Sequence, residues 1–258
     1  MAGQHLEISR FGPTDMPLRV VLLHEGLGSV AAWRDFPYRL ARRLGEPVLA
    51  YSRAGYGRSS AATAARGVRF MHHEAEVVLP ALLHALAVEQ PILIGHSDGA
   101  SIALIHAGMF RKTASASAEE PTCAIGVAVI APHLFVEEVT VREIDKLSRG
   151  FQNSGLASGL ARYHRNPVAT FYSWADVWLS DPFRRWSIEA EVAAIRCPLL
   201  AIQGEQDQYG TALQIERLGA LASHAKTLML PDCRHSPHRE QPEMVLAALT
   251  GVVAGLAC

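Results

Sequence analysis

Short apolar runs recur along the chain and alternate with longer stretches that mix apolar and polar residues. The runs are rich in Val, Ile and Leu and are bounded by Gly or Pro, which is typical of strands buried on both faces of a sheet. The segment 4–10 could add an antiparallel edge strand, because mixed sheets are common. The apolar runs predict strands at 18–23, 47–51, 91–95, 125–131, 198–203 and 226–230.

Between these runs the apolar spacing becomes that of amphipathic helices. It is clearest in the stretch 74–88, where apolar residues recur at intervals of three and four. Strands that alternate with helices indicate a largely parallel sheet with right-handed crossovers. The pattern predicts helices at about 33–44, 74–88, 100–110, 211–221 and 242–256.

The segment 136–195 breaks the alternation, because it contains helical patterns and no convincing strand. No Gly/Ser-rich linker flanks it, so we interpret it as a helical cap inserted into one domain that spans residues 1–258. The cap carries Trp174 and Trp178, which share one face of a helix because they are four residues apart, and also Trp186. The Ala/Ser-rich stretch 113–120 is expected to form a mobile surface loop.

Composition narrows the class of protein. The chain has 258 residues, of which 49% are hydrophobic and 19% are charged, enough for a buried core and unlike a disordered chain. Its net charge of -1 gives no basic excess for nucleic acid, and apolar runs such as 124–131 are too short to span a membrane. The N-terminus has no cationic and apolar signal pattern, so we expect a cytoplasmic protein. Reduced thiols are expected at four cysteines without Cys-x-x-Cys spacing: Cys123, Cys197, Cys233 and Cys258.

The sequence Gly-His-Ser-Asp-Gly at 95–99 is the strongest chemical motif. It follows an apolar strand and opens an apolar helix, the context of a nucleophile elbow. Ser97 is therefore the predicted nucleophile. His96, which precedes it, is expected to point away from Ser97 and to pack locally.

A serine nucleophile needs a base and an acid. Asp207 directly follows the predicted strand 198–203, and His235 directly follows the strand 226–230. The carboxyl ends of parallel strands meet at one edge of the sheet, so Ser97, Asp207 and His235 can converge there. The alternatives are Glu205 as the acid and His238 as the base; otherwise His238 is expected to be a surface residue before the last helix. Asp232 is expected to form a turn.

Acyl transfer also needs donors for the developing oxyanion. The backbone N–H of Asp98 is the first candidate, and the loop 24–29 should supply the second, with Leu27 favoured and Gly26 next. A carboxylate that pointed inward would oppose the oxyanion, so we expect the Asp98 side chain to point away or to pair with Arg53 or Arg58. The 12 histidines show no metal-ligand spacing, so no metal is expected.

Together these segments resemble the α/β-hydrolase superfamily. The resemblance covers the chain from about Leu18 onward, except the cap. Segment 24–29 with Trp33 looks like the family's His-Gly oxyanion loop with one residue added, and 52–59 is similar to its Arg-Gly-x-Gly-x-Ser loop, with Ala54 inserted or replaced. The remaining matches are 95–99 with its elbow, 204–207 with its acid loop and 233–235 with its histidine loop.

The size, short cap and motif order look most like the subgroup of enol-lactonases, meta-cleavage-product hydrolases and small carboxylesterases. The resemblance implies the α/β-hydrolase fold, a mostly parallel sheet flanked by helices with a small helical cap. It also implies no cofactor and a two-step acyl-enzyme mechanism. Haloalkane dehalogenases and epoxide hydrolases carry Asp at the nucleophile position, so Ser97 speaks against both.

Three functions are weighed. The first is a serine hydrolase of esters, lactones or related acyl bonds, and the second is a C–C bond hydrolase of a meta-cleavage-type dienone. The third is a catalytically idle small-molecule receptor, which the complete Ser, Asp and His set argues against. Each implies a small-molecule partner and neither nucleic acid nor membrane, while a homodimer stays open. The three cap tryptophans Trp174, Trp178 and Trp186 suggest an apolar or aromatic substrate, and the alternative explanation is packing of the cap onto the core.

Overall fold

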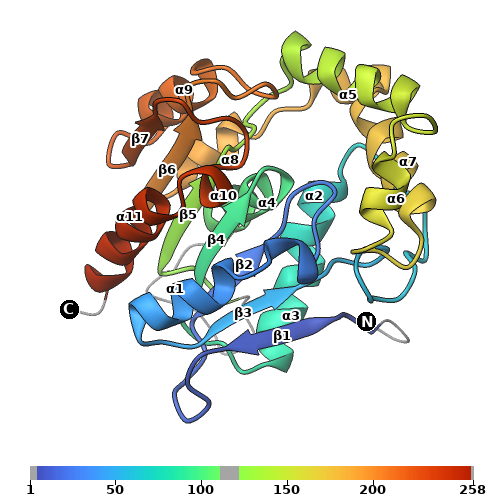
Figure 1. Cartoon of the computed structure of the whole chain (residues 1–258). Coiled ribbons are helices and arrows are strands. Elements are labelled where there is room, and N and C mark those ends of the chain that lie inside the picture. Colours follow the sequence, from blue (N-terminus) through green and yellow to red (C-terminus); the bar gives the residue numbers. More distant parts are fainter. Residues whose placement is uncertain (1–4, 111–121, 257–258) are drawn as a thin grey trace.

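The computed structural model describes residues 5–110 and 122–256 (Figure 1). Gln4, the predicted loop 113–120 and Cys258 therefore lie outside the described residues. Among the helices of the described part, none is both long and apolar enough to cross a membrane.

A seven-stranded sheet forms the centre, in the order β1-β3-β2-β4-β5-β6-β7. The edge strand β1 runs antiparallel to β3, with Ile8 opposite Tyr51, and every other neighbouring pair is parallel. The predicted strands and the antiparallel edge are confirmed. Their bounds are β1 (Ile8–Phe11), β2 (Val20–Leu23), β3 (Val48–Tyr51), β4 (Ile92–His96), β5 (Gly126–Ile130), β6 (Leu199–Gly204) and β7 (Lys226–Leu230).

Helices cover both faces of the sheet, because successive strand residues point to opposite sides. Val20 and Leu22 of β2 pack on the layer of α1 (Phe36–Leu44) and α11 (Pro242–Ala254), whereas Val21 and Leu23 pack on the opposite layer. Both layers are apparent in Figure 1. The opposite layer contains α2 (Phe70–His73), a π-helical turn (Glu74–Val78), α3 (Leu79–Ala85), α4 (Asp98–Met109), α8 (Glu189–Ala194) and α9 (Leu213–Leu221).

Two predicted helices differ from the observed ones. The stretch 33–44 is split into a 3-10 turn (Ala31–Trp33) and α1, because Arg34 takes a positive φ of 56° and breaks the regular backbone. The stretch 74–88 begins earlier, at Phe70, and contains the π-helical turn. Three-and-four spacing cannot reveal a π turn, because such a turn uses a different hydrogen-bond period.

The predicted cap segment contains α5 (Glu138–Gly150), α6 (Leu156–Leu160), α7 (Pro167–Trp178), a 3-10 turn (Asp181–Arg185) and α8. Figure 1 shows α5, α6 and α7 beyond the carboxyl ends of the central strands. By contrast, α8 packs on α4. The backbones come so close that a Cβ on Gly108 would lie 2.2 Å from the carbonyl oxygen of Glu191. The division of the chain into one domain with a cap at 136–195 stays a prediction.

Candidate active site

The turn between β4 and α4 presents Ser97 at the carboxyl end of the central strand. Ser97 has φ 53° and ψ −119°, a conformation that is costly for a residue with a side chain. The flanking glycines permit the sharp turn, because a Cβ at Gly95 would lie 2.2 Å from the carbonyl oxygen of Gly99. A Cβ at Gly99 would lie 2.1 Å from the carbonyl oxygen of Leu23. The local geometry is therefore that of the predicted nucleophile elbow.

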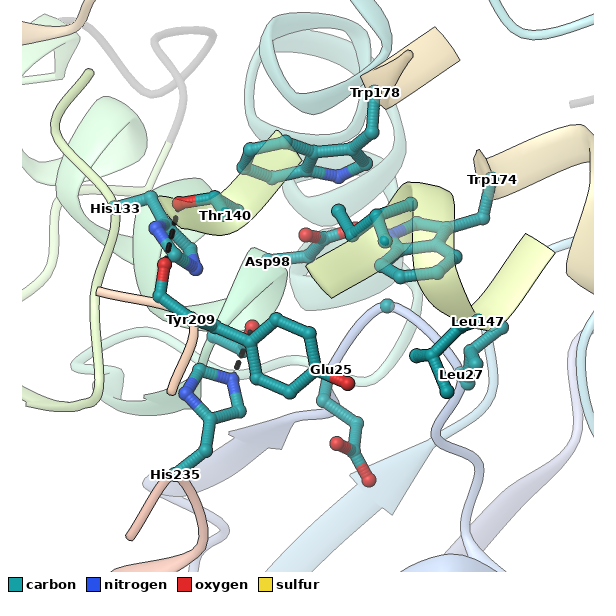
Figure 2. Close-up of a pocket in the computed structure, with 13 residues that line it drawn as sticks. Glu25, Leu27, Asp98, His133, Thr140, Leu147, Trp174, Trp178, Tyr209 and His235 are labelled. Atoms are coloured by element: carbon teal, nitrogen blue, oxygen red, sulfur yellow. Dashed lines mark hydrogen bonds between the residues drawn. The ribbon is translucent and has the colours of Figure 1, made fainter. Parts of the chain in front are cut away.

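Ser97, His235 and Asp207 form one chain of hydrogen bonds. The imidazole Nε2 of His235 lies 3.0 Å from Ser97 Oγ, a contact drawn in Figure 2, and Nδ1 lies 2.8 and 2.9 Å from the Asp207 carboxylate oxygens. Since a carboxylate only accepts, Nδ1 is assigned the proton. Nε2 is then free to accept the proton of the serine hydroxyl. The structure thus brings together the three residues predicted from the sequence.

The groups around these three hydrogen-bonded residues favour an ionised Asp207 and a charged form of His235. Burial alone would raise the pKa of Asp207, but the charge and ring N–H of His235 and the backbone N–H of Tyr209 hold it below its usual range. Burial lowers the pKa of His235, yet the charge and hydrogen bond of Asp207, together with the charges of Glu25 and Asp98, outweigh it, so the pKa of His235 is raised. The Tyr209 ring meets the imidazole edge-on at 4.8 Å. The pair can therefore stabilise an imidazolium that forms during reaction.

The alternative acids and bases take other positions. Glu205 is exposed, and Asp232 is exposed with a positive φ of 51°, as expected of a turn residue. His238 is buried, so its interpretation as a surface residue was wrong. The short helix α10 (Pro237–Glu240) directs the His238 ring inward, and the centroid of that ring lies 4.9 Å from the centroid of the Trp33 ring. His96 is buried as expected, and its Nε2 donates to the carbonyl oxygen of His235 at 2.7 Å.

The predicted oxyanion loop is held in place by hydrogen bonds that its backbone carbonyl groups accept. Arg53 donates to the carbonyl oxygens of His24 and Glu25, at 2.6 and 2.8 Å. Because the peptide bond is trans, the Gly26 N–H points opposite to the Glu25 carbonyl. Both Gly26 and Leu27 line the cavity in front of Ser97. Either N–H is therefore placed as a candidate donor, next to that of Asp98, which as the first residue of α4 has no partner within its helix.

His164, between α6 and α7, fixes this loop from the cap side. The Gly57 N–H donates to His164 Nδ1 at 3.0 Å, so Nε2 carries the proton and donates to the Leu27 carbonyl oxygen at 2.9 Å. Both ring nitrogens are thus committed to backbone groups. No local pattern in the sequence points to His164, because its contacts join segments that are far apart in the chain.

A cavity of about 70 Å³ opens in front of Ser97 (Figure 2). Trp174 and Trp178 both reach it, as their shared helix face suggested, whereas Trp186 stacks on Phe183 with ring centroids 5.3 Å apart. Among the described residues, no group of His, Cys, Asp and Glu is arranged to hold a metal ion. The lining consists of Glu25, Gly26, Leu27, Ser97, Asp98, His133, Thr140, Ile144, Leu147, Trp174, Trp178, Tyr209 and His235.

His133 is a lining residue that the sequence analysis missed. It is buried, its ring centroid lies 5.9 Å from that of His235, and burial followed by the charge of His235 lowers its pKa to about 3. It is therefore neutral at ordinary pH. The signal was available, because His133 follows strand β5 at the same sheet edge from which Asp207 and His235 were inferred.

The side chain of Asp98 does not point away from the cavity, and it pairs with neither of the arginines considered. It is 1% exposed and lies near Trp174 and Trp178 in Figure 2. Arg58 is exposed, and the guanidinium of Arg53 donates to the carbonyl groups already described. The expectation failed because α4 is buried nearly all round, so its first residue has no solvent side. Burial raises the pKa of Asp98 to about 6, against the lowering effect of Arg53.

The sequence from residue 20 to residue 248 matches the profile of the Alpha/beta hydrolase family. The chain belongs to the alpha/beta hydrolase family. It is therefore an enzyme of the hydrolase type, as the resemblance of its motifs implied. No curated protein matches the sequence significantly.

Solved structures of hydrolases share the fold. A carboxylesterase from Nitrososphaera gargenis superposes with a TM-score of 0.76 at 18% identity, over 98% of this chain and 96% of that chain. A hydrolase from Pseudomonas aeruginosa superposes with a TM-score of 0.73 at 20% identity, over 96% of this chain and 94% of that chain. The proline iminopeptidase of Mycobacterium smegmatis gives 0.73 at 16% identity, over 99% and 96%. At these identities the likeness concerns the fold alone.

Proposed function

We propose that this α/β-hydrolase is a serine hydrolase that cleaves an ester, lactone or related acyl bond of a small organic substrate. Ser97 is the nucleophile, His235 the base and Asp207 the acid that orients it. The observation that carries the proposal is the unbroken hydrogen-bond chain from Ser97 Oγ through His235 to Asp207, at the wall of a cavity.

The reaction follows from the direction of these hydrogen bonds. His235 Nε2 takes the proton of Ser97 Oγ as the oxygen attacks the carbonyl carbon, and the N–H groups of Asp98 and of Leu27 or Gly26 stabilise the oxyanion. The imidazolium then gives the proton to the leaving oxygen. Water attacks the acyl-enzyme in the same way, which releases the acid and restores Ser97.

The cavity favours a short acyl group. Its volume of about 70 Å³ is well below the ~150 Å³ of a cavity known to hold benzene. Ile144 and Leu147 of α5 and Trp174 and Trp178 of α7 supply apolar walls. We therefore propose a compact acyl portion, with the larger part of the substrate on the leaving-group side.

Labelling with a fluorophosphonate, combined with Ser97→Ala, tests the proposal. We expect the wild type to be labelled at Ser97 and the variant to lose both labelling and turnover while keeping its melting temperature. Ser236→Ala is the matched control, because Ser236 adjoins His235 but its hydroxyl does not cap α10. Labelling that persists in Ser97→Ala would reject the nucleophile assignment. In a panel of esters, lactones and dienones, faster cleavage of dienones would replace acyl-ester cleavage by C–C bond cleavage.

A further inference from the structure

The carboxylate of Asp98 is a buried charge at the cavity that lacks a matching partner. Neither of its oxygens accepts a hydrogen bond of good geometry from the described part of the chain, and the indole nitrogens of Trp174 and Trp178 are also unpaired there. Both indole N–H groups act on the Asp98 carboxylate as hydrogen-bond donors of poor geometry that lower its pKa, but burial outweighs them and the pKa is raised overall. Burying an ionised group without full compensation is costly, so this arrangement needs an explanation.

The nearby cations are engaged elsewhere. The guanidinium groups of Arg53 and Arg66 lie over the Tyr56 ring, at 4.8 and 4.4 Å from its centroid. Arg53 donates to two carbonyl groups of the oxyanion loop, and Arg66 donates to the carbonyl oxygen of Ala54 at 2.7 Å. Both act on Asp98 only through space. The cavity lining contains two carboxylates, those of Asp98 and Glu25, and neither Lys nor Arg.

The position of Asp98 fixes where a cation would sit relative to the reacting carbon. Asp98 directly follows Ser97, and adjacent Cα atoms are about 3.8 Å apart. A positive group held at its carboxylate would therefore lie close to the scissile carbonyl, within reach of an amino group on a neighbouring carbon of a short acyl part. The charge also opposes the oxyanion that forms beside the Asp98 N–H, which disfavours neutral acyl groups. A cation on the acyl group would cancel that opposition.

We propose that Asp98 binds a protonated amino group on the α- or β-carbon of the acyl part, so that the preferred substrates are esters of short amino acids. This inference rests on the proposed acyl-hydrolase function. The indoles of Trp174 and Trp178 cover the carboxylate, so the ammonium group displaces the edge of one of them. Such side-chain rearrangements are common on binding.

Binding can be measured without turnover in the Ser97→Ala variant. We expect N-benzylalaninamide, which carries the ammonium group, to quench tryptophan fluorescence at concentrations at least tenfold lower than N-benzylpropanamide, which lacks it. In Ser97→Ala with Asp98→Asn this preference should disappear. Equal binding of the two amides to Ser97→Ala would overturn the proposal, even if that protein's parent hydrolyses esters.

Kinetics give the second arm. For the wild type we expect kcat/KM for the benzyl ester of alanine to exceed that for the benzyl ester of propanoic acid at least tenfold, or about 1.4 kcal/mol. Asp98→Asn should reduce this ratio at least tenfold, because the intrinsically higher reactivity of the ammonium-bearing ester is the same for both proteins and cancels in the comparison; melting temperature and fluorophosphonate labelling are measured alongside. Glu25→Gln, which removes the other lining carboxylate, should retain a ratio well above one.

The outcomes separate the two proposals. A wild type that is labelled at Ser97 and hydrolyses both esters equally contradicts amine recognition and leaves the serine-hydrolase proposal intact. An unchanged ratio in Asp98→Asn with a lowered melting temperature contradicts it too, and assigns Asp98 to anchoring α7. A wild type that is neither labelled nor active on any acyl substrate rejects the proposed function instead. A tenfold binding preference would still stand in that case, because it is measured without turnover.

Discussion

The floor and the roof of the cavity differ in how their polar groups are satisfied. We define the floor as Ser97, His235, Asp207 and the loop 24–28, and the roof as α5 and α7 together with Asp98, which they cover. In the floor, the chain from Ser97 to Asp207 is hydrogen-bonded throughout, and the loop carbonyls are held by donors. In the roof, the Asp98 oxygens and two indole N–H groups lack such partners within the described residues.

This contrast separates chemistry from selectivity. A floor whose groups are already oriented by hydrogen bonds is what any acyl transfer requires, because preoriented donors and bases cost no reorganisation during reaction. The roof keeps polar groups available, and a substrate can supply their partners. Changes in the floor should therefore reduce turnover of all substrates, whereas changes in the roof should alter the order of preference among them.

The largest effect is expected from Asp207→Asn in the floor. The amide would favour the wrong tautomer of His235, so we expect kcat to fall on the order of 10⁴-fold for every acyl substrate, with little change in melting temperature. Steady-state kinetics on a neutral and a cationic ester measure it. Glu205→Gln is the matched control, since this exposed carboxylate lies two residues away. A large loss in Glu205→Gln with activity retained in Asp207→Asn would transfer the acid role to Glu205.

The next effect concerns the junction between floor and roof at His164. His164→Ala removes the donor to the Leu27 carbonyl and the acceptor of the Gly57 N–H, so the oxyanion loop should lose its fixed orientation. We expect kcat to fall roughly 10- to 100-fold, less than or equal to the loss of a whole oxyanion donor, with a smaller change in KM.

A conservative replacement distinguishes positioning from general destabilisation. His164→Gln keeps an acceptor and a donor on one side chain, so it should restore part of kcat. If His164→Ala and His164→Gln both kept the kcat of the wild type while their melting temperatures fell, His164 would contribute to stability alone.

The floor could be predicted from the sequence because its signals are local. Ser97 lies in a five-residue motif, and Asp207 and His235 follow predicted strands, so the geometry of a parallel sheet was enough to bring them together. The roof could not be predicted in the same way. The orientation of Asp98 depends on how α7 packs over α4. The contacts of His164 join residues that are 107 and 137 positions apart in the sequence. Periodicity carries no information on such contacts.

The smallest predicted effect is a shift in the pH dependence of kcat/KM, which reports the protonation of His235 in the floor. His235 must be neutral to accept a proton, so kcat/KM should rise with pH as the imidazolium loses its proton, with a midpoint above the ordinary imidazole value of about 6.5, because Asp207 raises the pKa of His235 despite burial. The charges of Glu25 and Asp98 raise the pKa of His235 further. Other ionisable groups that face the ring are His96, His133, Tyr209 and His238.

Glu25→Gln removes one of the charges that favour the imidazolium. The acid limb of kcat/KM for a neutral ester should therefore move to lower pH, by less than about one unit because the Glu25 side chain is partly exposed and its charge is partly screened. Glu205→Gln should leave the limb in place. A limb that moves to higher pH in Glu25→Gln would mean that the field of the cavity acts on His235 with the opposite sign. The two carboxylates that line the cavity, Asp98 of the roof and Glu25 of the floor, could then not be treated as a negative environment shared by substrate and base.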